Sequence, residues 1–389
     1  STLIGGGGND SISLSGGTFT DSTINGNLGS DLISAVGGVY TRAFVAAGGF
    51  NDTINMSSQF VSATINGGGG ADLLQLVGAT TISGTLIQGD DPGDALYFAN
   101  DTIQIGGVGV GTTTVLGGGG ADVFQVSATL TTGNSFQGGT GADSIVLSST
   151  SVVSAGLFIG MGNGNDTISV SALTNGFGTI QGGGGVDIVT VSGGAVNGGL
   201  IYGGEGADQI GLGTVSQGTW GTGRAVPVAG ASGVAVAYSN FSQSNLAGFD
   251  VISADAAAPT TGGNVFMVNQ SAVTFSAVAL GTFGVAGNQI TVATGSRVTN
   301  FSNAGTVSLT ARAAAIDASI GQGGTVIFQA GATNYLFVQG GAAGSGTDGD
   351  LVVQLNVLGF AALSGTPNGG VYGIDNSNVK IAFTDQNTF

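Results

Sequence analysis

The strongest constraint on this chain is an aspartate that returns at a nearly fixed interval through its first half. Most of these aspartates follow a run of glycines and precede a strand-like stretch, as in TINGGGGADLLQL from Thr64 to Leu76. The usual step is 21 residues, and one step of 29 residues carries the acidic insertion DDPGDALY. A fixed period of roughly 20 to 50 residues is typical of a stacked array of repeats. The repeat aspartates are Asp10, Asp31, Asp52, Asp72, Asp101, Asp122, Asp143, Asp166, Asp187 and Asp208.

Within each repeat the side-chain pattern is that of β-strands. The second and fourth residues after the aspartate are apolar, such as Leu74 and Leu76, and the residues between them are small or polar. This alternation predicts a strand with one buried face. A second apolar position, seven residues before the aspartate, ends a strand rich in Thr and Ser, as at Ile65. One unit cannot bury its apolar row alone, whereas stacked units form a continuous core. We therefore predict an all-β protein in which residues 1–215 form a parallel β-roll or β-solenoid of about ten 21-residue coils.

The acidic insertion leaves two questions open. Asp94 could replace Asp101 as the repeat aspartate, because the insertion makes the register ambiguous there. The run from Asp90 to Asp94 fits an exposed loop and an additional cation site equally well.

Composition removes most enzyme classes and several kinds of partner. The chain has no cysteine and no histidine, which excludes disulfides, thiolate metal sites and histidine-dependent nucleophiles. Only five residues are Lys or Arg against 22 acidic ones, so nucleic acid and anionic membranes are poor partners. No apolar run approaches the roughly 18 residues of a membrane span, so we expect no membrane insertion. No signal-peptide pattern is visible in this numbering, and no pair of acids outside the repeats marks a carboxylate active site. We therefore expect a protein that is not an enzyme.

The charge of the repeat region requires compensation. Residues 1–215 hold 15 acidic residues and one basic residue, Arg42, for a net charge of −14. Stacking would bring neighbouring carboxylates to about 5 Å, where they repel by roughly 3 kcal/mol at an effective dielectric of about 20. Calcium suits this column, because it is a hard cation that takes carboxylate and carbonyl oxygens. The structural alternative is a calcium-free solenoid whose aspartates only close turns through Asx hydrogen bonds.

The glycine–aspartate runs resemble the repeat GGxGxDxUx, with U apolar, of the RTX (hemolysin-type calcium-binding) family. The clearest matches are Gly67 to Asp72, Gly117 to Asp122, Gly138 to Asp143, Gly182 to Asp187, Gly203 to Asp208 and Gly5 to Asp10. The resemblance implies parallel β-rolls that fold on binding several Ca²⁺ ions, each held by an aspartate and by carbonyls of the glycine turn. The common form of the family repeats every nine or so residues, so the longer period here implies one calcium column along one edge. The metal ligands implied are the ten repeat aspartates with Gly68, Gly70, Gly118, Gly120, Gly139, Gly141, Gly183, Gly185, Gly204 and Gly206.

Residues 216–389 lack the motif and carry a different pattern. Short apolar runs separated by Gly, Ser and Asn predict a β-rich domain, with a short helix near residues 311–318. The segment from Tyr335 to Leu355 resembles the C-terminal module of large RTX and surface proteins, which implies a role in assembly or in type I secretion. Trp220, Arg224, Phe241 and Phe249 fit core packing better than sugar binding.

Three function classes follow from this reading. The favoured one is a secreted, extracellular structural protein of the bacterial surface, which self-assembles with calcium into a surface layer or filament. An open strand edge at the first coil would favour head-to-tail polymers. The partners expected are other copies of the chain, with cell-surface polysaccharide as a further candidate. The alternatives are an adhesin or matrix-binding module, and the calcium-binding tail of a secreted enzyme.

Overall fold

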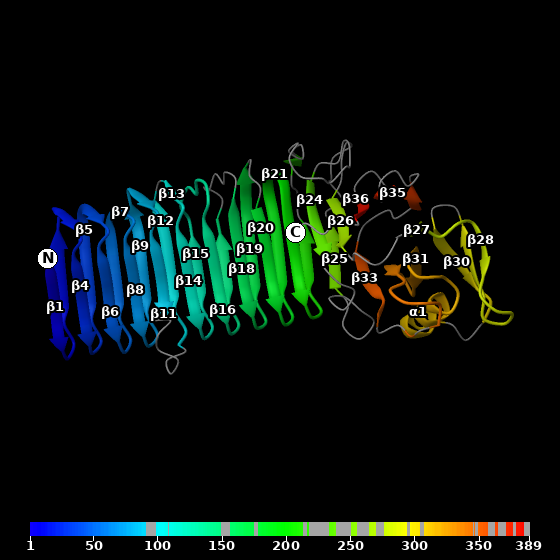
Figure 1. Cartoon of the computed structure of the whole chain (residues 1–389), viewed down its shortest axis with the longest axis horizontal. Coiled ribbons are helices and arrows are strands. Elements are labelled where there is room, and N and C mark those ends of the chain that lie inside the picture. The colour runs from blue at the N-terminus through cyan, green and yellow to red at the C-terminus, as the bar shows by residue number, and fades with distance from the viewer. Residues whose placement is uncertain are drawn as a thin grey trace. The chain divides into compact units, whose positions relative to one another are not determined.

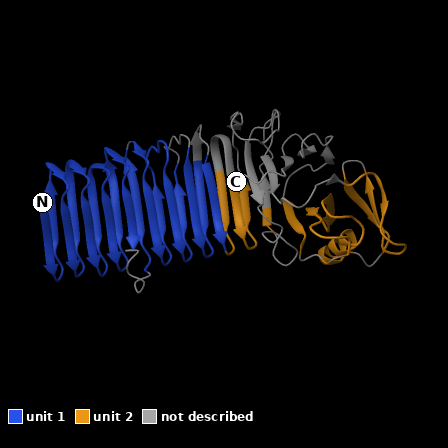
Figure 2. Cartoon of the chain, viewed as in Figure 1, with its two compact units in different colours: residues 1–184, 192–194 blue, residues 185–191, 195–389 orange. Residues whose placement is uncertain are grey.

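A computed structural model gives the fold of this chain. The residues that it describes are 1–90, 99–107, 109–148, 156–174, 178–212, 216–217, 233–238, 250–254, 264–269, 276–293, 296–303, 307–344, 346, 349–356, 362–364, 371–375 and 379–384. Five residues discussed in the sequence analysis lie outside these ranges. They are Asp94, the alternative repeat aspartate, and the four residues assigned to core packing rather than sugar binding, Trp220, Arg224, Phe241 and Phe249. The chain divides into two compact units, residues 1–184 with 192–194 and residues 185–191 with 195–389 (Figure 2).

The first unit consists of strands joined by tight turns. Its strands are β1 (Thr2–Gly7), β2 (Ser11–Ser15), β3 (Thr18–Thr20), β4 (Thr23–Leu28), β5 (Leu32–Thr41), β6 (Phe44–Gly49), β7 (Thr53–Val61), β8 (Thr64–Gly69), β9 (Leu73–Ala79), β10 (Thr81–Ser83), β11 (Leu86–Asp90), β12 (Thr102–Gly107), β13 (Val110–Gly111), β14 (Thr114–Gly119), β15 (Val123–Val126), β16 (Ser135–Thr140), β17 (Ser144–Leu147), β18 (Leu157–Asn163), β19 (Thr167–Thr174) and β20 (Gly178–Gly184).

These strands form a parallel β-solenoid. Each turn has one strand that extends into its glycine run and one strand after its aspartate, and equivalent strands of successive turns pair in parallel (Figure 1). For example, β4 pairs with β6 and β6 pairs with β8, so that Ile24, Val45 and Ile65 occupy one register position. The strand that the sequence predicts to end at Ile65 instead begins at Thr64 and continues through Gly69, because the glycine backbones also pair with the neighbouring turns. The solenoid has about nine turns of about 21 residues, which confirms the predicted all-β fold class.

The core lies between the two strand rows and matches the apolar pattern of the repeats. The row before the glycine turns contains Ile24, Val45, Ile65, Ile87, Val115, Phe136 and Ile159, all buried. The facing row, two residues after each aspartate, contains Ile12, Ile33, Ile54, Leu74, Ile103, Phe124, Ile145 and Ile168, which are also buried. Since every turn repeats both positions, each turn covers the apolar side chains of its neighbours.

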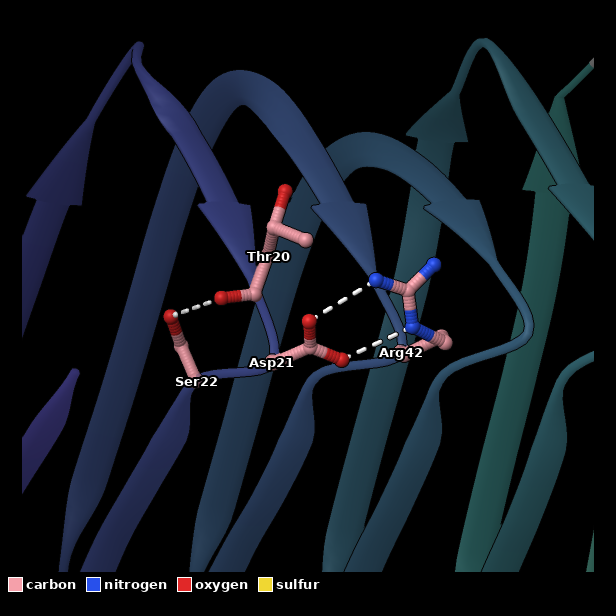
Figure 3. Close-up of polar contacts among 4 residues, drawn as sticks. All are labelled: Thr20, Asp21, Ser22 and Arg42. Carbon is pink, nitrogen blue, oxygen red and sulfur yellow. Dashed lines mark hydrogen bonds and ion pairs between the residues drawn. The ribbon is translucent and has the colours of Figure 1, made fainter.

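The return turns carry residues in the left-handed backbone region. Asp21 and Arg42 have φ values of 47°, and Ser62 and Thr112 occupy the same conformation in later turns. Asp21 and Arg42 stand one turn apart and form an exposed ion pair at 2.7 Å (Figure 3). Both side chains are more than half exposed, so solvent screens the pair and its contribution to stability is small.

The second unit adds further solenoid strands and an antiparallel sheet. Its elements are β21 (Ile188–Glu205), β22 (Gln209–Leu212), β23 (Ser216–Gln217), β24 (Gly233–Tyr238), β25 (Asp250–Ala254), β26 (Asn264–Asn269), β27 (Ser276–Ala277), β28 (Gly281–Phe283), β29 (Ile290–Ala293), β30 (Arg297–Phe301), α1 (Leu309–Asp317), β31 (Gly324–Ala330), β32 (Thr333–Val338), β33 (Leu351–Asn356), β34 (Ala362–Ser364), β35 (Val371–Asp375) and β36 (Val379–Thr384). Strands β21, β22 and β25 pair in parallel, whereas β28–β29–β30 and β31–β32–β33 are antiparallel.

Helix α1 lies against the antiparallel part of this unit. Its Ser308 N-cap accepts the backbone N–H of Ala311 at 3.1 Å, which satisfies one of the free amides of the first turn. Ile316 of the helix packs in one buried cluster with Val326, Phe328 and Phe337 of the sheet. The helix near residues 311–318 and the strands on either side agree with the sequence prediction. No helix among the described residues is long and apolar enough to cross a lipid bilayer.

Candidate metal centre

The repeat aspartates form a ladder at the glycine turns. In the first unit, the backbone N–H of each aspartate donates to Oδ1 of the aspartate one turn later, at 2.6–2.8 Å, from Asp10 through to Asp166. In the second unit the same bond joins Asp187 to Asp208 at 2.9 Å. The ladder passes through Asp101, which decides the register at the insertion. Each carboxylate is thus fixed by the turn that precedes it.

The second carboxylate oxygen, Oδ2, faces a backbone carbonyl. A β-carbon placed on Gly117 would lie 2.3 Å from Oδ2 of Asp122 and 2.6 Å from the carbonyl oxygen of Gly138 in the next turn. Gly89 is similarly placed against Asp101 and the carbonyl of Gly117. The carboxyl oxygen and the carbonyl therefore border the same small space, which glycine leaves open at these positions.

These Oδ2 atoms are enclosed and have no hydrogen-bond donor. Their solvent-accessible surface is below 1 Å², and no hydrogen-bond partner is present for them in the described residues. The aspartates of which this holds are Asp10, Asp31, Asp52, Asp72, Asp101, Asp122, Asp143 and Asp208. Two enclosed acceptors that border the same space repel each other. A proton on the carboxyl group or a bound cation would remove this repulsion.

The glycines predicted as metal ligands adopt positive φ values in the turns. Their φ values lie between 112° and 138°, a region that residues with side chains avoid. This holds for Gly68, Gly70, Gly118, Gly120, Gly139, Gly141, Gly183, Gly185, Gly204 and Gly206. The carbonyls of Gly118 and Gly120 lie over the α-carbons of Gly139 and Gly141, at 1.9 and 1.8 Å from where a β-carbon would be. These glycines allow the turns to stack at close range.

The carbonyl beside each Oδ2 belongs to a position that the predicted ligand set omits. It is the residue five before the next aspartate, as with Gly138 beside Asp122 and Gly26 beside Asp10; at the insertion, Gly89 takes this place beside Asp72, twelve residues before Asp101. The glycine run itself contained this signal, because the fifth residue before the aspartate is glycine in most repeats. The predicted ligands are the glycines four and two residues before the aspartate, so the prediction missed the glycine five residues before it.

Burial shifts the titration of the ladder. Desolvation raises the pKa of Asp72, Asp101 and Asp122 from 3.8 to about 8, despite the backbone N–H that each accepts. Desolvation likewise raises the pKa of Asp52, Asp143 and Asp208 to about 6. The middle of the ladder therefore resists ionisation most strongly in the absence of a bound cation.

A calcium ion is compatible with this donor set. Carboxylate and backbone carbonyl oxygens are the ligands that calcium takes, and Oδ2 together with the facing carbonyl supplies both kinds in six turns, those of Asp10, Asp31, Asp72, Asp101, Asp122 and Asp143. Within the described ranges, no three acidic side chains come together to hold a metal by themselves. A cation here would therefore take backbone carbonyls with one or two carboxylates.

The structure adds two aspartates to this edge. Asp208 donates its N–H to Oδ1 of Asp250 at 2.8 Å, so Asp250 is a further member of the ladder. It stands 42 residues after Asp208, which is two periods, and the segment DVISA after it keeps the apolar alternation. Asp90 replaces a turn glycine, and its Oδ2 accepts the N–H of Gly119 at 2.9 Å. Its negative charge also raises the pKa of Asp72, Asp101 and Asp122, which places it near the ladder.

Fold and site together define a class of protein, a parallel β-solenoid with a buried aspartate ladder at its glycine turns. Comparison with protein-family models finds no match to the chain, and a search of curated proteins finds no significant relative.

Proposed function

We propose that this chain is a calcium-binding structural protein of the bacterial cell exterior that assembles into a surface layer or filament, and that it is not an enzyme. The observation that carries the proposal is the ladder, in which a buried carboxyl oxygen faces a carbonyl in turn after turn. Calcium bound there would neutralise the column and tie each turn to the next. The resemblance of the turns to RTX repeats supports the same reading.

The distribution of charge supports self-assembly. Among the described acidic residues of 1–184, only Asp21 is classed as exposed, and it pairs with Arg42. The large negative charge of this region is therefore mostly internal. Once it is compensated, the surface has little net charge, and exposed apolar side chains such as Val36, Phe50 and Val77 remain on it. Surfaces with little net charge and exposed apolar groups favour association between copies.

Replacing Asp122 with Asn tests the metal sites. The amide keeps the acceptor for the N–H of Asp101 but removes the negative charge. We expect the variant to bind about one calcium ion fewer than the native protein in isothermal titration calorimetry. Asp21→Asn is the matched control, because Asp21 is exposed and lies away from the ladder. Equal stoichiometry in both variants would contradict the assignment of calcium to the ladder.

Calcium titration followed by light scattering tests assembly. Scattering should rise as the ladder sites fill, because compensation removes the repulsion between copies. The same titration with Asp21→Asn should give the same curve. A protein that binds calcium yet stays monomeric at high concentration would instead favour an adhesin or the tail of a secreted enzyme.

A further inference from the structure

The strands that follow the aspartates in the first unit present a surface without charge. These strands are β2, β5, β7, β9, β12, β15 and β17, which pair side by side in one parallel row (Figure 1). The residues one and three after each aspartate from Asp10 to Asp143 alternate with the buried core positions, and none of them is buried. They therefore lie on the outer side of the row, together with Val36 and Val77, which stand five after their aspartates. We call this set the uncharged face, because its members are Ser, Thr, Asn, Gln, Leu and Val.

Large apolar side chains project from the uncharged face. Val36 and Val77 are 66% and 52% exposed, and Leu32 and Val146 are exposed as well. Apolar side chains that gather on one face of a protein mark an interaction surface. The uncharged face is therefore a candidate for contact with a partner.

The glutamines in the middle of this face are paired with one another. Nε2 of Gln75 donates to Oε1 of Gln104 at 2.9 Å, and Nε2 of Gln104 donates to Oε1 of Gln125 at 3.1 Å. Both ends of the Gln104 amide are thus engaged within the sheet. Covering a polar group that already has a partner costs less than covering a free one, so the middle of the face is suited to a dry contact.

The size of the uncharged face is sufficient for a pair of copies. Seven strands about 4.8 Å apart, each contributing about five residues of about 3.3 Å, cover roughly 550 Å². Two such faces in contact would bury about 1,100 Å², which reaches the lower limit of about 1,000 Å² for a specific interface. The outer face of the opposite sheet is a weaker candidate, because Ala46, Asn66 and Gln88 on it are buried.

We propose that the uncharged face binds the same face of a second copy of this chain, with one sheet packed on the other. Two copies of this face meet without repulsion, although each whole chain carries a net charge of −17. An ionic partner, in contrast, finds no charge on the face with which to pair. The contact is isologous, so both copies contribute the same residues. The inference rests on the self-assembly of the proposed function and deepens it by naming the contact surface.

The test is sedimentation velocity of the full chain in calcium over a series of protein concentrations. The native protein should form dimers that dissociate on dilution. Val77→Lys should raise the dissociation constant of the dimer at least tenfold, because the contact would then bury two ammonium groups without partners. Val146→Lys should act in the same direction.

Phe44→Lys and Leu28→Lys are the matched controls. They introduce the same charge at exposed apolar residues away from the uncharged face, Phe44 in β6 of the opposite sheet and Leu28 at the end of β4. Both variants should dimerise like the native protein. Circular dichroism and calcium stoichiometry show whether each variant folds with its ladder filled, and Val146→Lys decides the matter if Val77→Lys does not fold.

The outcomes separate this inference from the proposed function. Equal dimerisation of Val77→Lys and Phe44→Lys would overturn the contact at this face while leaving the calcium sites untouched. Dimers that are lost in Val77→Lys but form without calcium binding would support the face and contradict the calcium sites. A native protein that binds calcium yet stays monomeric would overturn both the face and the proposed assembly. Retention of that monomer on cellulose, lost in Val77→Lys, would assign the face to a sugar polymer instead.

Discussion

Calcium removal at about pH 8 is expected to unfold the solenoid, whereas the calcium-free protein should stay folded at about pH 5. Burial raises the pKa of the Asp72, Asp101 and Asp122 carboxyl groups from the ordinary value of 3.8 to about 8 in the folded chain. Because the folded pKa is raised, the stability from these groups is fully present below about 3.8 and is lost as the pH rises through about 8. When calcium is bound, the ion takes the place of the proton, and the dependence of the folding stability on pH should largely disappear.

Circular dichroism with a chelator that acts over this pH range measures the effect. The β signal and the thermal midpoint should fall between about pH 5 and pH 8 in chelator and remain nearly constant in calcium. Asp122→Asn is the internal control, since its neutral amide can donate to the carbonyl of Gly138 at every pH, and it should be less sensitive to chelation. An unchanged spectrum at about pH 8 after complete calcium removal would contradict the calcium column.

Gly139→Ala is expected to be among the most damaging single substitutions in the solenoid. Gly139 has a φ of 117°, and an added β-carbon would lie 1.9 Å from the carbonyl oxygen of Gly118. Backbone strain and overpacking together should lower the free energy of unfolding by about 3 kcal/mol or more. The measurement is chemical denaturation in calcium.

Gly7→Ala is the matched control for this substitution. Gly7 is exposed, is not among the glycines with positive φ, and has no atom within 4 Å of the added β-carbon. Its replacement should change the free energy of unfolding by less than about 0.5 kcal/mol. Equal small losses at both positions would show that the turns do not stack as closely as described.

The solenoid was predictable because one physical rule repeats in every turn. Apolar residues such as Ile65 and Leu74 recur at the same offsets from an aspartate, and a unit with one apolar face must stack to bury it. The register at the insertion was not predictable, because spacing alone treats Asp94 and Asp101 alike. Hydrogen bonds to the aspartates before and after it select Asp101.

The details of the site were less accessible from the sequence. The period identified the carboxylates but could not show which carbonyl faces them, since that depends on how turns offset as they stack. The structure shows that the carbonyl belongs to the residue five before the next aspartate, such as Gly138, whose carbonyl faces Asp122. Asp250 was missed because a full period without an aspartate separates it from Asp208.

The ladder gives the solenoid a polarity. The amide of Asp122 is satisfied by the side chain of Asp143, one turn later, and the amide of Asp101 is satisfied by Asp122 in the same way. A turn added at the N-terminal end of a formed stack therefore meets an acceptor that is already in place. A turn added at the C-terminal end must bring its own carboxylate to the waiting amide. The loss of one carboxylate, for example that of Asp122, therefore leaves an unpaired amide in the turn before it, at Asp101.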